Sequence, residues 1–554
     1  MIFDRLISLG GMIASVRQVF TSFNRKIRGR TGPCNHSQKT LKIDSSMRHQ
    51  LVTVIDFGGQ YTQLIVRRVR EQGVYSEMVP WTKAAQYFAE KRPDAVILSG
   101  GPRSVLEDNA PTLDFSLIEG IPTLGICYGQ QLMAYRLGGR VRKATEREYG
   151  RRHLGHAVEG TLPSVLHNDQ VWMSHGDQVE EVPPGFLVSV STDSCPIAGF
   201  ENDAKRLYGV QFHPEVSHTP DGRELLKTFL FQKAGLKGDW TTANFIEESV
   251  AKIRAEVGDK RVLCAVSGGV DSSVAAALLS QALGENVTCV FIDHGLLRKG
   301  EAEQVVDMFT RVFHPKLVAI NARRQFLDAL SGVTDPERKR KIIGEEFVKC
   351  FETHSNELQG CDFLAQGTLY PDVIESGSDT AAKIKTHHNV GGLPDWMKLK
   401  LIEPFRWLFK DEVREVGRAL GLPAEVVDRE PFPGPGLAVR ILGEITEERV
   451  KVTQDADWIF REEIRLAGLN KGIWQSYAAL LDVRSMGVMG DERTYEQPIV
   501  LRAVQSEDAM TATAFPFPFE FLEKVALRIV NEVSGVNRVL YDLTSKPPAT
   551  IEWE

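Results

Sequence analysis

The sequence predicts an α/β multidomain protein, and three observations support that prediction. At 554 residues the chain is too long for one hydrophobic core, so roughly three or four domains are expected. From residue 51 onward, short apolar runs rich in β-branched residues alternate with helical periodicity, which is typical of layered α/β folds. Two glycine-rich turns, at 125–131 and 267–273, each follow one of these runs, so two separate ligand loops are expected at strand ends.

The apolar runs place the expected strands in three groups along the chain. They are Leu51–Ile55, Ala95–Leu98, Pro122–Ile126 and Lys205–Phe212 in the first group, Val262–Val266 and Val287–Ile292 in the second, and Pro498–Val504 and Arg538–Asp542 in the third. An Ala-rich helix is expected from Ser273, directly after the second glycine-rich turn.

Composition shifts divide these groups into domains. A polar stretch at 216–245 is expected to be a linker, and a Pro- and Gly-dense stretch at 429–436 is expected to be a second boundary. Domains are therefore expected at 47–238, 239–430 and 431–554, the last of them a smaller α+β domain.

Residues 1–46 form an extension of different composition. They carry basic residues against very few acids, with apolar residues between, as organelle transit peptides do. A disordered tail, or an upstream stretch that is not translated, is the alternative, and Met47 is then the candidate start. We expect a cytoplasmic protein, with organellar targeting by residues 1–46 as the second interpretation.

Charge, hydropathy and cysteine usage exclude several classes of protein. The net charge is −7 and the body of the chain has no basic run, so a nucleic-acid partner is not expected. No segment approaches the ~18 apolar residues of a membrane span. The seven cysteines are scattered without a CxxC pair, which argues against disulfides and zinc and favours a reducing compartment.

The first glycine-rich turn carries a candidate nucleophile, Cys127. A strand that ends in Gly-x-Cys-x-Gly puts the thiol at a helix N-terminus, where the helix dipole stabilises a thiolate. Cysteines are commonly buried and inert, so this spacing alone is weak. His213 and Glu215 end another predicted strand and can supply a base and the carboxylate that orients it. Residues 99–102 end a third strand and can present N–H groups to an oxyanion.

In order and spacing these segments resemble class I glutamine amidotransferases, over residues 51–236. The resemblance implies that Cys127 attacks the side-chain amide of glutamine, that His213 is the general base and then the acid, and that Glu215 orients His213. It also implies an oxyanion site and a glutamine site made of Gly101, Tyr128, Gln131, His175 and Asp177.

The second turn, Ser-Gly-Gly-Val-Asp-Ser-Ser, is suited to phosphate. Backbone N–H groups, hydroxyls and a helix dipole together make an anion cradle, although a generic Gly/Ser turn is the alternative. It has no lysine, so kinase-like transfer is not indicated. The turn resembles the pyrophosphate motif of the N-type ATP pyrophosphatases, which have a Rossmann-like nucleotide α-hydrolase fold. The resemblance implies that ATP binds at Ser267, Gly268, Gly269, Val270, Asp271, Ser272 and Ser273, with Mg²⁺ at Asp271, Asp372 and Glu375.

Three further segments narrow the family. Residues 377–392 are expected to be a mobile lid, residues 431–438 a rigid turn or a linker, and residues 545–554 a docked strand or a frayed tail. Together with residues 334–336, 340–344 and 365–368 they resemble the glutamine-hydrolysing GMP synthases, of the shorter type that forms homodimers through the C-terminal domain. The resemblance implies a lid of Lys385, Thr386, His387, His388 and Asn389, and an XMP site of Arg340, Pro433, Gly434, Asp491, Gln497, Lys546, Ile551 and Glu552.

The expected reaction joins the two turns. It is ATP + XMP + L-glutamine + water → AMP + diphosphate + GMP + L-glutamate, through a glutamyl thioester on Cys127 and an adenylated XMP. The expected partners are these small molecules, with neither nucleic acid nor membrane. Another glutamine-dependent ligase such as NAD synthetase, a thiouridylase-like RNA enzyme and a non-catalytic binding protein are the alternatives.

Overall fold

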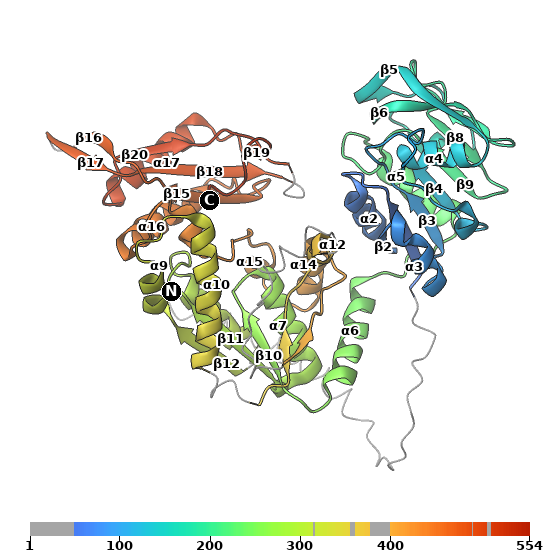
Figure 1. The fold of residues 1–554 in the computed structure, drawn as a ribbon. Coiled ribbons are helices and arrows are strands. Elements are labelled where there is room, and N and C mark those ends of the chain that lie inside the picture. Colours follow the sequence, from blue (N-terminus) through green and yellow to red (C-terminus); the bar gives the residue numbers. More distant parts are fainter. Residues whose placement is uncertain (1–48, 314–315, 355–359, 377–398, 490, 507–510) are drawn as a thin grey trace, which may run out of the picture. The chain divides into compact units, whose positions relative to one another are not determined.

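The computed structural model describes residues 49–554 except 314–315, 355–359, 377–398, 490 and 507–510 (Figure 1). The extension at 1–46 and the lid at 385–389 therefore lie outside the described residues. The boundaries drawn from the sequence at 238 and 430 stay predictions.

The first sheet is mostly parallel and has the order β2-β1-β3-β4-β9-β8-β7. Its strands are β1 (Leu51–Asp56), β2 (Tyr75–Pro80), β3 (Ala95–Leu98), β4 (Thr123–Ile126), β7 (Leu187–Val190), β8 (Gly199–Asn202) and β9 (Leu207–Val210). β3, β4 and β9 run in parallel, whereas β8 and β7 pair antiparallel. The carboxyl ends of parallel strands meet at one edge, so the loops that follow β3, β4 and β9 converge there.

Helices and a second, two-stranded sheet complete this part of the chain. The helical elements are α2 (Thr62–Glu71), η1 (Trp81–Lys83), α3 (Ala84–Glu90), η2 (Phe115–Ile118), α4 (Tyr128–Arg136), η3 (Leu162–Val165), α5 (Gly222–Thr228) and η4 (Phe229–Lys233). β5 (Arg140–His153) pairs antiparallel with β6 (Gln170–Glu181), so residues 148 and 175 lie opposite each other.

The stretch at 216–245, expected to be a linker, is largely helical. α5 and η4 occupy its first half, and α6 (Thr242–Val257) begins in its last residues. Leu225, Leu226, Phe229 and Leu230 are all fully buried there. The prediction was wrong because the apolar residues are spaced to cover one face of a helix, and that face packs into the core despite the polar average.

The central sheet is parallel throughout, in the order β12-β11-β10-β13-β14. Its strands are β10 (Val262–Val266), β11 (Val287–Asp293), β12 (Lys316–Asn321), β13 (Phe363–Ala365) and β14 (Lys400–Ile402). Every residue of β11 is buried, as expected for a strand covered on both faces.

The helices around this sheet include α7, which packs on β10 and β11. They are α7 (Val270–Leu283), η5 (Gly284–Asn286), α8 (Glu301–Met308), η6 (Phe309–Phe313), α9 (Arg323–Leu330), α10 (Pro336–Thr353), α12 (Tyr370–Ser376), α14 (Lys410–Ala419) and α15 (Ala424–Val427). α7 begins at Val270 rather than at Ser273, because Gly269 has the extended backbone of a helix cap. Asp271 and Ser272 therefore belong to the first helical turn.

The last part of the chain is α+β, as predicted. β15 (Gln475–Leu480), β18 (Pro498–Gln505), β19 (Thr513–Ala514) and β20 (Arg538–Tyr541) form one sheet, and β16 (Ser485–Met489) pairs with β17 (Glu492–Glu496). The helical elements are η7 (Gly436–Arg440), α16 (Glu447–Leu466) and α17 (Phe519–Glu532).

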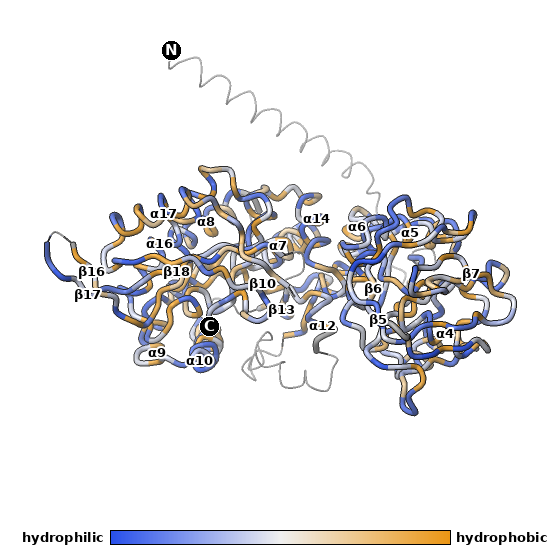
Figure 2. The backbone as a smooth tube through the Cα atoms, turned by 90° about the horizontal axis from the view of Figure 1, so that it is seen from above, coloured by the Kyte–Doolittle hydropathy of each residue, from blue (hydrophilic) through white to orange (hydrophobic). Residues whose placement is uncertain are grey.

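Apolar and polar stretches alternate along the backbone (Figure 2). Among the described residues no helix is both long and apolar enough to cross a membrane. The described cysteines are all free thiols.

Candidate active sites

Cys127 lies on a strained turn between β4 and α4. Its backbone has φ 52° and ψ −105°, a conformation that residues with a side chain rarely adopt. A Cβ at Gly129 would lie 2.3 Å from the Leu98 carbonyl oxygen, and one at Gly125 would lie 2.7 Å from the backbone of the same helix turn. Only glycine fits on either side of the cysteine, so close packing of the backbone holds the turn in its strained shape.

His213 and Glu215 follow β9 and meet this turn. His213 Nδ1 lies 2.7 Å from Glu215 Oε1, and both side chains are buried. Burial alone lowers the pKa of His213, but the Glu215 charge and a hydrogen bond with the Cys127 side chain raise the pKa well above its ordinary value. The ring of Tyr61 packs edge-on against His213, with 5.3 Å between ring centroids. The structure therefore brings the three predicted catalytic residues together, with the imidazole between thiol and carboxylate.

Glu215→Gln is expected to lower glutamine-dependent turnover about 100-fold, within the range of general acid–base effects. The carboxylate keeps His213 protonated in the Cys–His pair, so its loss moves the upper pH limit of glutamine turnover to lower pH. The pH profile of kcat/KM for glutamine measures this, with the ammonium-dependent profile as control. If Glu215→Gln leaves the high-pH limb of the kcat/KM profile for glutamine unchanged, Glu215 does not have the proposed role.

The predicted oxyanion residues lie at the same strand ends. Tyr128 is the first residue of α4, and the first amides of a helix have no partner within the helix. Gly101 follows β3, and a Cβ there would lie 3.2 Å from the Tyr128 ring. Gly101 and Tyr128 are therefore neighbours beside Cys127.

The predicted glutamine-binding residues meet at one backbone carbonyl. Gln131 Nε2 donates to the Asp177 oxygen at 2.8 Å, and His175 Nδ1 lies 3.0 Å from the same oxygen. Earlier in β6, the Ser174 oxygen lies 3.7 Å from Cys127 Sγ. Segment 174–177 thus contacts Cys127 through the Ser174 carbonyl.

The second loop closes on itself at the N-terminus of α7. The Ser267 amide donates to Ser272 Oγ at 3.2 Å, and Ser272 Oγ donates to the Gly269 oxygen at 3.2 Å. Gly268 has φ +76°, and a Cβ there would lie 2.4 Å from a Val305 methyl carbon, so only glycine fits. With Val270 as the first helical residue, the loop and the helix end present amides and hydroxyls to an anion.

Asp271 is suited to a divalent cation. Its Oδ1 is buried without a hydrogen-bond partner among the described residues. Burial raises the pKa of Asp271, Lys410 opposes that rise, and the nearby Asp372 carboxylate adds to it. Carboxylate oxygens are the ligands that Mg²⁺ prefers, so Asp271 and Asp372 fit the predicted ion. The backbone of Glu375 lies in α12, but its side chain is outside the described residues.

Two basic residues that the sequence did not single out contact this loop. Arg429 Nη1 donates to the Gly268 oxygen at 2.8 Å, and its Nη2 pairs with Glu301. Lys410 Nζ lies 3.4 Å from Asp271 Oδ2. Both lie more than a hundred residues further along the chain, in segments without a motif, so no local pattern could have found them.

The C-terminal segment docks on the described body of the protein. Arg440, which is fully buried, donates twice to Glu552, at 3.0 and 3.1 Å. Gln475 Nε2 donates to Glu552 Oε1 at 2.7 Å and to the Pro431 carbonyl at 3.1 Å. The structure therefore brings the PFPGPG turn (residues 431–436) and the end of the chain together.

This segment is docked but is not the strand that the sequence predicted. The last strand, β20, ends at Tyr541. Beyond it the Ile551 carbonyl accepts hydrogen bonds from the Tyr477 hydroxyl and from Arg502, so side chains take the place of a neighbouring strand. Pro547 and Pro548 lack the N–H groups that a ladder needs.

The other predicted XMP residues lie at several places. Arg340, on α10, pairs with Glu337. Asp491 is in the turn between β16 and β17, and Gln497 Nε2 donates to the Leu481 oxygen at 3.0 Å. Lys546 bridges Ala512 by backbone hydrogen bonds, and Pro433 and Gly434 lie in the loop between α15 and η7.

Family comparisons match three stretches of the chain. Residues 53–233 match the family described as glutamine amidotransferase class-I, residues 260–306 match the tRNA methyl transferase HUP domain, and residues 462–553 match the GMP synthase C terminal domain. The HUP match contains the SGGVDSS loop and covers only the start of the central sheet.

Curated relatives match nearly the whole chain. The GMP synthase [glutamine-hydrolyzing] of Clostridium novyi is 56% identical over 513 residues, which is 92% of this chain and 100% of the relative. The protein of the same description from Symbiobacterium thermophilum is 58% identical over 512 residues, again 92% of this chain and 100% of the relative. A solved structure of a glutamine amidotransferase from Thermotoga maritima is 18% identical, with a TM-score of 0.27, over 34% of this chain and 99% of that one.

Proposed function

Because the chain belongs to the glutamine-hydrolysing GMP synthases, we propose that it converts XMP to GMP with ATP and glutamine. The observation that carries the proposal is that one chain holds both an assembled Cys–His–Glu triad and an anion loop that includes Asp271. One buried oxygen of this carboxylate has no hydrogen-bond partner in the part of the chain that the structure describes. The NAD synthetase alternative is not favoured, since the relatives that match over nearly the full length are GMP synthases.

In the first half-reaction the Cys127 thiolate attacks the side-chain carbonyl carbon of glutamine. The oxyanion that forms accepts hydrogen bonds from the amides of Gly101 and Tyr128. His213 donates its proton to the leaving nitrogen, and ammonia departs. Water, activated by the same imidazole, then hydrolyses the glutamyl thioester and frees glutamate.

In the second half-reaction the C2 oxygen of XMP attacks the α-phosphorus of ATP, and pyrophosphate leaves. The loop 267–273 receives the pyrophosphate through its amides, its hydroxyls and the N-terminus of α7. Mg²⁺ held by Asp271 and Asp372 would neutralise part of the charge on the leaving group. Ammonia then attacks C2 of the adenylated XMP, and AMP departs with the former C2 oxygen.

We place XMP between the PFPGPG turn and the docked C-terminal segment. The Gln475 amide and the Glu552 carboxylate meet there, and both hydrogen-bond with polar groups of the neighbouring segments. Lys546 is the proposed partner of the 5′-phosphate, because an ammonium is a compact point charge suited to phosphate.

A homodimer formed through the last part of the chain is also proposed. Val488, Tyr495 and Leu543 expose 71%, 55% and 76% of their surface there, and exposed large apolar side chains favour association. Light scattering of the intact protein would give twice the chain mass; a monomer at micromolar concentration would contradict the proposal.

The function is tested by incubating the protein with XMP, ATP, Mg²⁺ and glutamine. GMP, AMP, pyrophosphate and glutamate are expected in equal amounts. IMP is the matched control, because it lacks the C2 oxygen that must attack ATP, so no AMP should form with it. ATP cleavage that needs a different acid, such as nicotinate adenine dinucleotide, and yields no GMP with XMP would reject the proposal.

A further inference from the structure

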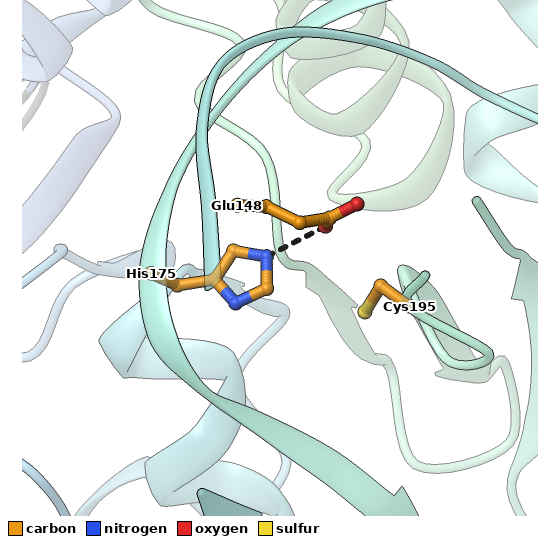
Figure 3. A group of neighbouring side chains, drawn as sticks. All are labelled: Glu148, His175 and Cys195. Atoms are coloured by element: carbon orange, nitrogen blue, oxygen red, sulfur yellow. Dashed lines mark hydrogen bonds and ion pairs between the residues drawn. The ribbon is translucent and has the colours of Figure 1, made fainter. Parts of the chain in front are cut away.

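A buried polar cluster lies behind the glutamine site, away from the triad itself. Glu148 on β5 and His175 on β6 face each other across the strand pair, and Cys195 lies beside them (Figure 3). Among the described residues this is the one group of three potential metal ligands whose ligand atoms lie within 4.8 Å of one another. All three residues are buried.

Hydrogen bonding in the cluster argues against a metal ion. Both ring nitrogens of His175 already have partners, and burial raises the pKa of the Cys195 thiol to about 12, which disfavours the thiolate that binds metal. Structural zinc sites use four ligands, and three are present here among the described residues. The cluster is therefore better explained by the charge of Glu148 and by the hydrogen bonds to its carboxylate than by a bound metal ion.

The partners of His175 fix the orientation of its ring. Nδ1 lies 3.0 Å from the Asp177 carbonyl oxygen, which can only accept, so Nδ1 must carry a proton. Nε2 lies 2.9 Å from Glu148 Oε2. Burial alone raises the pKa of Glu148, but hydrogen bonds from His175, Ser194 and Thr192 outweigh it and lower the pKa. The His175 ring is therefore held at both nitrogens, between the Asp177 carbonyl and the Glu148 carboxylate.

The loop that carries Cys195 completes the surroundings of Glu148. Thr192 Oγ1 donates to Glu148 Oε1 at 3.0 Å, and Ser194 Oγ donates to the same oxygen. Thr192 Oγ1 in turn accepts the Cys195 amide at 2.9 Å, so the turn is built around these hydroxyls. Arg152 Nε lies 3.6 Å from Glu148 Oε1. Every carboxylate oxygen of Glu148 is thus engaged.

The His175 ring in turn contacts the predicted glutamine site. Its Nδ1–H and the Gln131 amide both donate to the Asp177 oxygen, and Gln131 lies on α4, the helix that Cys127 caps. The Ser174 oxygen, next to His175 in β6, lies 3.7 Å from Cys127 Sγ. A shift of the His175 ring would therefore move the Asp177 carbonyl that holds Gln131 and the neighbouring Ser174 carbonyl that faces Cys127.

We propose that Glu148 is a positioning residue for glutamine hydrolysis, which holds the His175 ring against the Asp177 carbonyl and so fixes segment 174–177 beside Cys127. The inference rests on the proposed function, because it needs glutamine as the substrate of Cys127. Glu148 itself lies in the β5–β6 pair and acts through His175 and Asp177.

Two substitutions separate the charge of Glu148 from its volume. Glu148→Gln keeps the shape and can still donate to a neutral His175, so it removes only the charge. We expect kcat/KM for glutamine to fall about 10-fold in Glu148→Gln and about 100-fold in Glu148→Ala, since displacement of a site by about 1 Å costs up to that much. The rate of GMP formation from ammonium, measured on the same preparations, is expected to stay at the wild-type value.

Glu201→Gln is the matched control. Glu201 is also a buried carboxylate of this part of the chain, but it accepts the Leu162 amide at 2.7 Å and pairs with Lys233. Its glutamine kinetics should equal those of the wild type. If Glu148→Gln keeps wild-type kcat/KM for glutamine, or loses ammonium-dependent activity in parallel, the proposal is wrong. If the wild-type protein releases no glutamate from glutamine, the proposed function fails first and the inference with it.

Discussion

Cys127→Ala is expected to abolish GMP formation from glutamine, with a loss of about 10⁴-fold or more, as for removal of other enzymic nucleophiles. Formation of GMP from added ammonium should be unchanged. The reason is spatial: Cys127 lies with His213 at the end of strands of the first sheet, whereas the anion loop proposed to bind ATP follows a strand of the central sheet. Steady-state rates with each nitrogen source measure the two activities on one preparation.

The same substitution tests whether the strained turn depends on the thiol. The introduced alanine must adopt the same φ of 52°, so the variant keeps the backbone strain and removes only the sulfur. Cys350→Ala is the matched control, because it removes a buried thiol that lies on α10, away from the triad and from the Glu148 cluster. Equal loss of both activities in Cys127→Ala would show that the two sites are not separate.

Asp271→Asn is expected to lower the cleavage of ATP in the presence of XMP by roughly 10³-fold, or about 4 kcal/mol of transition-state stabilisation. The change keeps the volume of the side chain but removes the charge that would hold Mg²⁺ next to the leaving pyrophosphate. Release of AMP and pyrophosphate is the measurement. Both nitrogen sources should be affected equally, since adenylation precedes amination. Normal turnover in Asp271→Asn would refute the assignment of the loop.

The Asp271→Asn variant should fold at least as well as the wild type in the absence of ligands. Burial raises the pKa of Asp271, so the folded state binds this proton more tightly than the unfolded chain does. The stabilising effect of the protonated form is present at low pH and is lost as the pH rises through the folded-state pKa. At neutral pH the charge of Asp271 therefore costs stability, whereas a neutral asparagine side chain does not. Thermal unfolding at pH 7 and at acidic pH measures the difference, which should vanish on acidification.

The two glycine-rich turns could be predicted from the sequence because their signals are local. In each of them a strand, glycines and a helix start lie within a dozen residues. The Leu98 backbone leaves no room for a Cβ at Gly129, and the Val305 side chain leaves none at Gly268. β3, β10 and β11 were located to within about one residue for a related reason, since apolar β-branched runs mark buried strands directly.

Longer-range features could not be predicted. Arg429 reaches Gly268 across 161 residues, and Glu148 reaches His175 across 27 residues of the chain, and neither side chain stands in a recognisable motif. The start of α7 was misplaced by three residues because Val270 is a poor helix former in isolation, and the cap at Gly269 decides where the helix begins. Helical propensity is a weak guide where the backbone geometry of a cap is set by packing.

The short segment from Arg429 to Arg440 joins the anion loop to the proposed XMP site, so we expect the binding of the two nucleotides to be coupled. Arg429 donates a hydrogen bond to the Gly268 carbonyl, and Arg440 donates to the Glu552 carboxylate. Pro431, Pro433 and Pro435 restrict the backbone between them. Because segment 429–440 contacts both sites, a ligand that shifts the segment at one site is expected to change ligand binding at the other. By reciprocity, XMP must then change the dissociation constant of ATP by the same factor by which ATP changes that of XMP, and calorimetric titration of each ligand with and without the other would give that factor twice.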